Sequence, residues 1–170
     1  DDLRGYVLGQ ADSAQGHLHN QGVGSGDLFL FYGIFQEVEE KGKKWLTIPG
    51  SRQKYVFFGW MQVDRVIDLC DPKQKENLIN NYPDIELHPH MIKEYKSNNA
   101  LYLPKQGDLI LDGKYTGKAC SGKFTYHDKR CLSSSYSLNM STWLLPECFS
   151  SKDAFSKVTD IKQVDALNVE

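Results

Sequence analysis

The chain has 170 residues and a formal net charge of −2, with 40% hydrophobic and 25% charged residues. This length is typical of one domain with a hydrophobic core, and the composition excludes a disordered chain. The net charge excludes a domain that holds nucleic acid by overall positive charge. No apolar run is long enough to cross a bilayer. We therefore expect a single cytoplasmic domain over residues 1–170, without a membrane partner, and residues missing before Asp1.

A polar, glycine-rich segment precedes the clearest predicted strand. Residues 14–31 read AQGHLHNQGVGSGDLFLF, in which a cluster of hydrogen-bonding side chains is followed by a turn and an apolar run. We interpret the polar part as an extended loop, in which His17 and His19 would share a face. The nearly continuous apolar run over residues 27–38 predicts a strand covered on both faces.

A second strand with a similar aromatic pattern follows. Residues 54–69 read KYVFFGWMQVDRVIDL, and the basic segment at residues 41–45 is typical of an exposed hairpin tip. We expect residues 27–35 and 55–63 to be neighbouring strands. Gly59 interrupts the second pattern, which indicates a bulge or a close backbone approach.

The remaining chain predicts few helices. Residues 72–80 form a short helix capped by Asp71, residues 88–90 (HPH) are expected to be extended, and residues 100–103 form a short strand. Residues 114–137 are expected to form a loop or an irregular hairpin, and residues 153–170 a short helix and a final strand. This pattern favours a small α+β fold, with a mixed or antiparallel curved sheet or partial barrel and few short helices.

Four cysteines, at positions 70, 120, 131 and 148, form no C-x-x-C pair. We expect reduced thiols and no zinc knuckle, because a chain of this size folds without disulfides. The sequence also lacks a glycine-rich phosphate loop, a dinucleotide fingerprint, a nucleophile elbow and a metalloprotease helix.

Two histidine pairs are the strongest candidates for a site. The first pair lies beside Gln15 and Asn20, where three interpretations stay open: a structural polar loop, a ligand-binding cluster and, least favoured, a metal site. The second pair, His88 and His90, flanks a proline that stiffens the backbone, which suits base recognition, proton transfer or metal binding. The alternative is an exposed turn with two solvated histidines.

Aromatic residues are abundant, and most of them are expected in the core. An exposed pair of rings over a polar pocket would hold a flat heterocycle by stacking. Trp60 is the best single candidate because Gly59 lets the backbone approach a ligand there, and Tyr32 or Phe35 could supply the second ring.

Five blocks of the sequence together resemble the nucleotide modification-associated domain 3 family. They are GQADSAQGHLHNQGVGSGDLFLFYGIF, FFGWMQV, HPH, NNALYL and TWLLPECF, and they extend from residue 9 to residue 149. The family occurs mainly in bacterial and phage genomes near genes for modified DNA bases, which implies a role in making, reading or restricting modified nucleic acid. Separately, the pairing of GDLFLFY with FFGWMQV resembles the core of PUA-like domains, which carry pockets for modified or flipped bases.

The resemblance implies that a set of polar, glycine and aromatic residues of this chain correspond to characteristic positions of the family. His19 is not among them. The set comprises Gln15, His17, Asn20, Gly26, Asp27, Gly33, Phe35, Gly59, Trp60, His88, His90, Tyr102, Trp143, Pro146 and Phe149. Family members tend to have an acidic, histidine-containing stretch upstream of GQ. Here only DDLR precedes it, which puts any site built from that stretch in doubt.

The leading hypothesis is a binding module for a nucleotide or a modified base in nucleic acid, linked to DNA modification or phage defence. Gln15, His17 and Asn20 would bind the base edge, His88 and His90 would contact phosphate or base, and Trp60 with Tyr32 or Phe35 would stack. The first alternative is an enzyme acting on nucleic acid or nucleotides, with His17, His88 and His90 as acid–base or metal-binding groups. The second is a protein-interaction domain. We predict no cofactor and no metal for the binding module.

Overall fold

The structure, a computed structural model, describes residues 6–95, 97–133, 142–146 and 164–167. The chain divides into two compact units. Unit 1 comprises Asp1–Leu30 and Gly59–Lys123, and unit 2 comprises Phe31–Phe58 and Phe124–Glu170. The expectation of a single domain over residues 1–170 stays a prediction.

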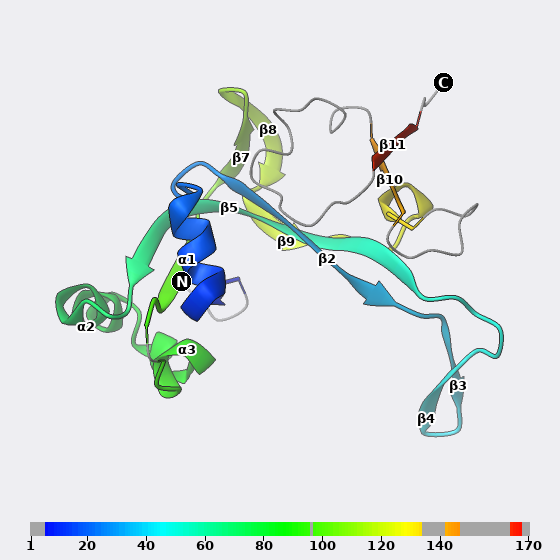
Figure 1. The fold of residues 1–170 in the computed structure, drawn as a ribbon, viewed down its shortest axis with the longest axis horizontal. Coiled ribbons are helices and arrows are strands. Elements are labelled where there is room, and N and C mark those ends of the chain that lie inside the picture. The colour runs from blue at the N-terminus through cyan, green and yellow to red at the C-terminus, as the bar shows by residue number, and fades with distance from the viewer. Residues whose placement is uncertain (1–5, 96, 134–141, 147–163, 168–170) are drawn as a thin grey trace. The chain divides into compact units, whose positions relative to one another are not determined.

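The main sheet is antiparallel in the pairs that define its register (Figure 1). Its strand order is β1-β6-β5-β2, and β9 also pairs with β5. The strands are β1 (Leu8–Gln10), β2 (Leu28–Phe35), β5 (Lys54–Asp68), β6 (Ala100–Pro104) and β9 (Ser121–Lys123). The predicted pairing of residues 27–35 with 55–63 is therefore confirmed.

The long strand β5 is curved, and its irregularity lies in a different place from the one expected (Figure 1). The register against β6 shifts between Val63 and Arg65, whereas Gly59 pairs in register with Lys123. A β-bulge increases the local twist of a strand, so the bulge near Val63 accounts for part of the curvature.

The predicted helix at residues 72–80 is confirmed, because α2 spans Pro72–Asn81 and the Asp71 side chain accepts hydrogen bonds from the backbone of Lys73 and Gln74. Two segments expected to be extended are instead helical. The first is α1 (Asp12–Asn20), and the second is α3 (Pro89–Ile92), which follows the 3₁₀ turn η1 (Pro83–Leu87). Proline fits the first helical position because it lacks the amide hydrogen that would have no partner there.

Short two-stranded elements complete the described chain. The predicted hairpin tip at residues 41–45 connects a separate hairpin, because β2 already ends at Phe35. These elements are β3 (Val38–Lys41) with β4 (Lys44–Thr47), β7 (Asp108–Leu111) with β8 (Lys114–Ala119), and β10 (Trp143–Pro146) parallel to β11 (Val164–Leu167). A 3₁₀ turn, η2, spans Asp128–Arg130. The helix expected after residue 153 lies outside the described residues.

The core of unit 1 lies on one face of β6. Leu101 and Leu103 are fully buried or nearly so, and they pack with Leu69, Leu78 and Ile85 from the segments around α2 and η1. Tyr102 lies between these two leucines in sequence, so its side chain points to the opposite face. The few short helices and the antiparallel sheet confirm the predicted α+β class.

Candidate functional site

Helix α1 carries the first histidine pair, and contacts from outside the helix fix its start. The backbone amide of Asp12 donates to the carbonyls of Ser97 (3.2 Å) and Asn98 (3.0 Å), while the N-cap residue Ala11 supplies no side-chain cap. Gln15 is 7% exposed, and its Oε1 accepts a hydrogen bond of 3.0 Å from the Tyr102 hydroxyl. The helix is therefore anchored on the Tyr102 face of β6.

The helical conformation separates the two histidines of the first pair. Residues two apart in a helix point about 200° apart around its axis, so His17 and His19 do not share a face. His19 and Asn20 are exposed, whereas His17 is partly buried. The Nε2 atom of His17 is buried and has no hydrogen-bond partner among the described residues. A buried polar atom without a partner costs free energy, so the position of this nitrogen is unfavourable without a further contact.

The second pair is held rigidly at the start of α3. The His88 Nδ1 accepts a hydrogen bond of 3.2 Å from the backbone amide of His90, so this imidazole acts as the helix cap. His90 Nδ1 lies 2.8 Å from the Asn99 Oδ1, and the Asn99 amide donates to the His90 carbonyl at 2.9 Å. The two imidazole centroids are 5.6 Å apart, and His90 stacks on Tyr95 at 4.7 Å.

The His90 ring lies directly over the backbone of β1. A Cβ atom added to Gly9 would fall 2.2 Å from the ring, so only glycine permits this contact. Burial lowers the pKa of His88 below its usual value and the neighbouring His90 lowers it further, while a backbone hydrogen bond with Val7 acts in the opposite direction. The lowered pKa favours the neutral imidazole, in which Nδ1 accepts the His90 amide.

The two histidine pairs are anchored on opposite faces of the β1–β6 ladder. Gln15 binds Tyr102, which is paired with Leu8, whereas His90 covers Gly9, which is paired with Leu101. Adjacent pairs of a ladder alternate between faces. The two anchoring contacts are thus on different faces, and the expected convergence of His17, His88 and Trp60 on one concave site stays a prediction.

The predicted stacking residues belong to different units. The Trp60 indole donates to the Ala119 carbonyl at 2.9 Å, and a Cβ on Gly122 would fall 2.6 Å from its ring, so Trp60 covers the backbone of β9 in unit 1. In unit 2, Tyr32 makes edge contacts with Tyr55 and Trp143, and Phe35 makes one with Phe58.

Sequence reasoning missed Asn99, Gly9 and Tyr95 as parts of the second histidine cluster. Asn99 is 8% exposed, and both ends of its side-chain amide bind His90. The available signal was the asparagine pair directly before the buried strand ALYL. A polar residue next to a fully apolar strand is buried only when its hydrogen bonds are satisfied.

No group of three or more histidine, cysteine, aspartate or glutamate side chains in the described part of the chain could hold a metal ion. Cys70, Cys120 and Cys131 are free thiols, and Cys148 lies outside the described residues. That all four cysteines are reduced stays a prediction. Measuring the intact mass of the protein before and after reduction would test it. None of the helices within the described residues is long and apolar enough to span a membrane.

A comparison with protein-family models identifies the class of this chain. The model for nucleotide modification associated domain 3 matches residues 2–166. The chain belongs to this family, as the five sequence blocks indicated, and is therefore associated with nucleotide modification. No curated protein and no solved structure matches the chain, so the resemblance to PUA-like domains stays an analogy.

Proposed function

We propose that this protein binds a nucleotide or a modified base of nucleic acid through the histidine clusters of unit 1, in DNA base modification or phage defence. The observation that carries the proposal is the His88–His90 pair, held by the helix cap and by Asn99. Imidazole rings hydrogen-bond both the donors and the acceptors on the edge of a base. Membership of a nucleotide modification family supports the same ligand class.

The remaining predicted residues take secondary roles in this proposal. His17 stays a proposed contact to the base edge, and Gln15 fixes α1 through Tyr102. Asn20 is exposed at the end of the helix and suits a contact with phosphate or sugar. Trp60, Tyr32 and Phe35 stay proposed stacking residues.

One observation favours an enzyme as the second candidate. The His88 and His90 rings lie 5.6 Å apart, and histidine is the side chain that most often serves as a general base. In that case His88, His90 and His17 would be the acid–base groups. The chemical fate of the ligand separates the two candidates.

The test is a calorimetric titration of the full-length protein with unmodified and modified nucleosides and nucleotides. We expect His88→Asn to weaken binding by about fivefold or more, since one hydrogen bond to a buried polar ligand group is lost. Asparagine is a good N-cap, so this variant keeps the start of α3. His17→Gln should weaken binding, whereas His19→Gln on the other side of α1 should not.

Mass spectrometry of the recovered ligand decides between the two candidates. Unchanged ligand with saturable binding supports the binding module. Turnover that disappears in His88→Asn while the fold is retained would establish the enzyme instead. Binding that is equal in the wild type and both histidine variants would refute a site at these clusters.

A further inference from the structure

Unit 2 carries a row of aromatic side chains that extends across three neighbouring strand segments. On β2, alternate residues Phe31, Gly33 and Phe35 share one face. The Phe58 ring of β5 lies 6.1 Å from Phe31 in a stacked arrangement and 5.9 Å from Phe35 in an edge arrangement. Since β2 and β5 are neighbours, these three rings form one aromatic surface.

The row continues beyond β5. The backbone amide of Phe124 donates to the Phe58 carbonyl at 2.9 Å, and the register of Gly59 with Lys123 places Phe124 opposite Phe58. Opposed residues in a ladder point to the same face. Phe124 therefore extends the surface onto the third segment.

Gly33 leaves the ring faces of this surface uncovered, because it has no side chain. A Cβ on Gly33 would lie 3.3 Å from the Phe35 ring and 3.5 Å from the Phe58 ring. No side chain rises between the rings at this position, and Phe35 and Phe58 are 46% and 41% exposed. Exposed phenylalanines grouped in this way are unusual unless a partner covers them.

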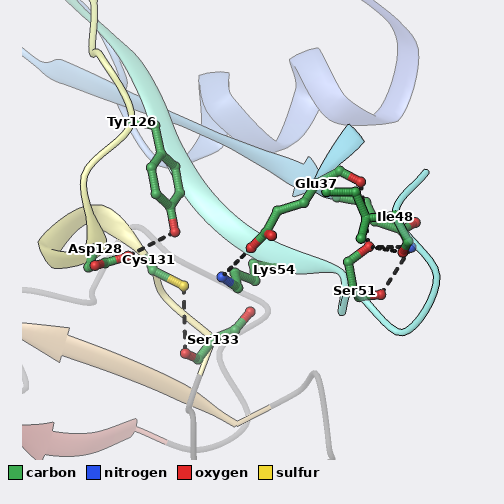
Figure 2. Close-up of polar contacts among 9 residues, drawn as sticks. Glu37, Ile48, Ser51, Lys54, Tyr126, Asp128, Cys131 and Ser133 are labelled. Carbon is green, nitrogen blue, oxygen red and sulfur yellow. Dashed lines mark hydrogen bonds and ion pairs between the residues drawn. The ribbon is translucent and has the colours of Figure 1, made fainter. Parts of the chain in front are cut away.

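The surface also carries positive charge. The Arg130 guanidinium lies 4.7 Å from the centroid of the Phe124 ring, and its side chain donates to the Thr125 carbonyl. Lys54 is paired with Glu37 at 3.2 Å, and Tyr126 donates to Asp128 at 2.9 Å (Figure 2). The described residues of unit 2 contain seven lysines and arginines against five carboxylates, although the whole chain has a net charge of −2.

We propose that this face of unit 2, defined by Phe31, Phe35, Phe58, Phe124 and Arg130, is a stacking platform for single-stranded nucleic acid. Bases of a duplex cover each other's faces, so rings on the face of a sheet can stack only on unpaired bases. Aromatic rings across adjacent strands offer such faces in succession, and Arg130 can contact a phosphate while remaining over Phe124. The platform does not depend on the histidine clusters of unit 1.

The test is fluorescence anisotropy of the full-length protein with labelled oligo-dT and oligo-rU of about 15 nucleotides, and with a duplex of equal length. We expect tight single-strand binding to DNA, RNA or both, and weaker duplex binding. Phe58→Leu and Phe35→Leu retain apolar bulk but lose the ring, and should weaken single-strand binding by about fivefold or more. Tyr115→Leu, which changes a 76% exposed ring of unit 1, is the matched control and should have no effect.

A salt titration examines the charge separately. Arg130→Gln should reduce the slope of log Kd against log salt by about 0.7 on single strands, while Lys73→Gln on α2 leaves it unchanged. Circular dichroism confirms that each variant is folded, and Phe35→Leu replaces Phe58→Leu if the latter unfolds. The proposal would be overturned if single strands did not bind, or if the duplex bound equally well. An equal loss of binding in Tyr115→Leu would also overturn it. Because His88→Asn changes only the histidine cluster and Phe58→Leu changes only the platform, failure of either site is visible without the other.

Discussion

Among the described residues, the buried polar side chains lie in unit 1, and exposed large apolar side chains are more numerous in unit 2, eight against five. In unit 1, three buried polar side chains are hydrogen-bonded: Gln15 binds Tyr102, Gln62 binds Gly26 and Ile110, and Asn99 binds His90. In unit 2, large apolar side chains remain exposed within the described residues. They are Tyr32, Ile34, Phe35, Val38, Trp45, Leu46, Phe58 and Tyr126.

This difference separates two kinds of recognition. A buried hydrogen-bond network fixes directions, so unit 1 is suited to distinguishing one base from another. Exposed rings fix a flat ligand without reading its edge, because every base has a face that can stack. We infer that unit 1 supplies selectivity and unit 2 supplies affinity for the strand.

The largest effect expected from this comparison is on stability. Leu101→Ala removes a fully buried side chain from the core of unit 1 and should lower the free energy of unfolding by about 2–5 kcal/mol. Leu46→Ala on the exposed β3–β4 hairpin of unit 2 should change it by less than about 0.5 kcal/mol. Urea denaturation of both variants measures the difference, and equal losses would show that the hairpin is buried in the protein in solution.

A smaller effect is expected where the backbone of β1 touches His90. Gly9→Ala places a methyl group 2.2 Å from the imidazole, so the ring must move and stability should fall by about 1–3 kcal/mol. The same variant should lose nucleoside binding but retain single-strand binding by unit 2. Gly24→Ala is the control, because the nearest atom to its added Cβ is 4.0 Å away. Nucleoside binding that survives in Gly9→Ala would remove His90 from the site.

The smallest effect is a dependence of stability on pH. The folded-state pKa of His88 lies below its ordinary value of 6.5, so the unfolded chain takes up a proton first as the pH falls. The stabilisation by neutral His88 is complete above about pH 6.5 and is lost as the pH falls through the folded-state pKa. His88→Asn should make denaturation midpoints between pH 7 and pH 5 less steep, and His19→Asn should not. An unchanged profile in His88→Asn would contradict the assigned shift.

The local signals of the sequence were sufficient for some elements. Asp71 before Pro72 is a strong helix start, and the aromatic, β-branched patterns of β2 and β5 are typical of neighbouring strands. Helix α1 lacked such signals, because its N-cap is Ala11 and its first amide is satisfied by carbonyls of Ser97 and Asn98. Contacts between residues about 85 positions apart cannot be inferred from local periodicity.

The site was predictable only as a set of residue types. His88 and His90 were identified, but Pro89 was taken as a stiff extended residue although proline also suits the first position of a helix. The placement of Gln15 and His90 on opposite faces follows from the register of β1 with β6, which the sequence does not reveal. The same holds for Phe124, whose place beside Phe58 depends on the pairing of β9 with β5.

The division of the chain has a consequence for its biosynthesis. Unit 1 is interrupted by Phe31–Phe58, so its two parts are separated by a whole segment of unit 2. During translation, the hydrogen bonds of α1 and β1 to β6 can form only after β6 has emerged from the ribosome. Closing this long loop slows folding, and until then the aromatic rings of β2 and β5 are open to aggregation. The order of synthesis thus leaves these rings without their unit 1 neighbours at the stage when residues 31–58 have left the ribosome and residue 100 has not.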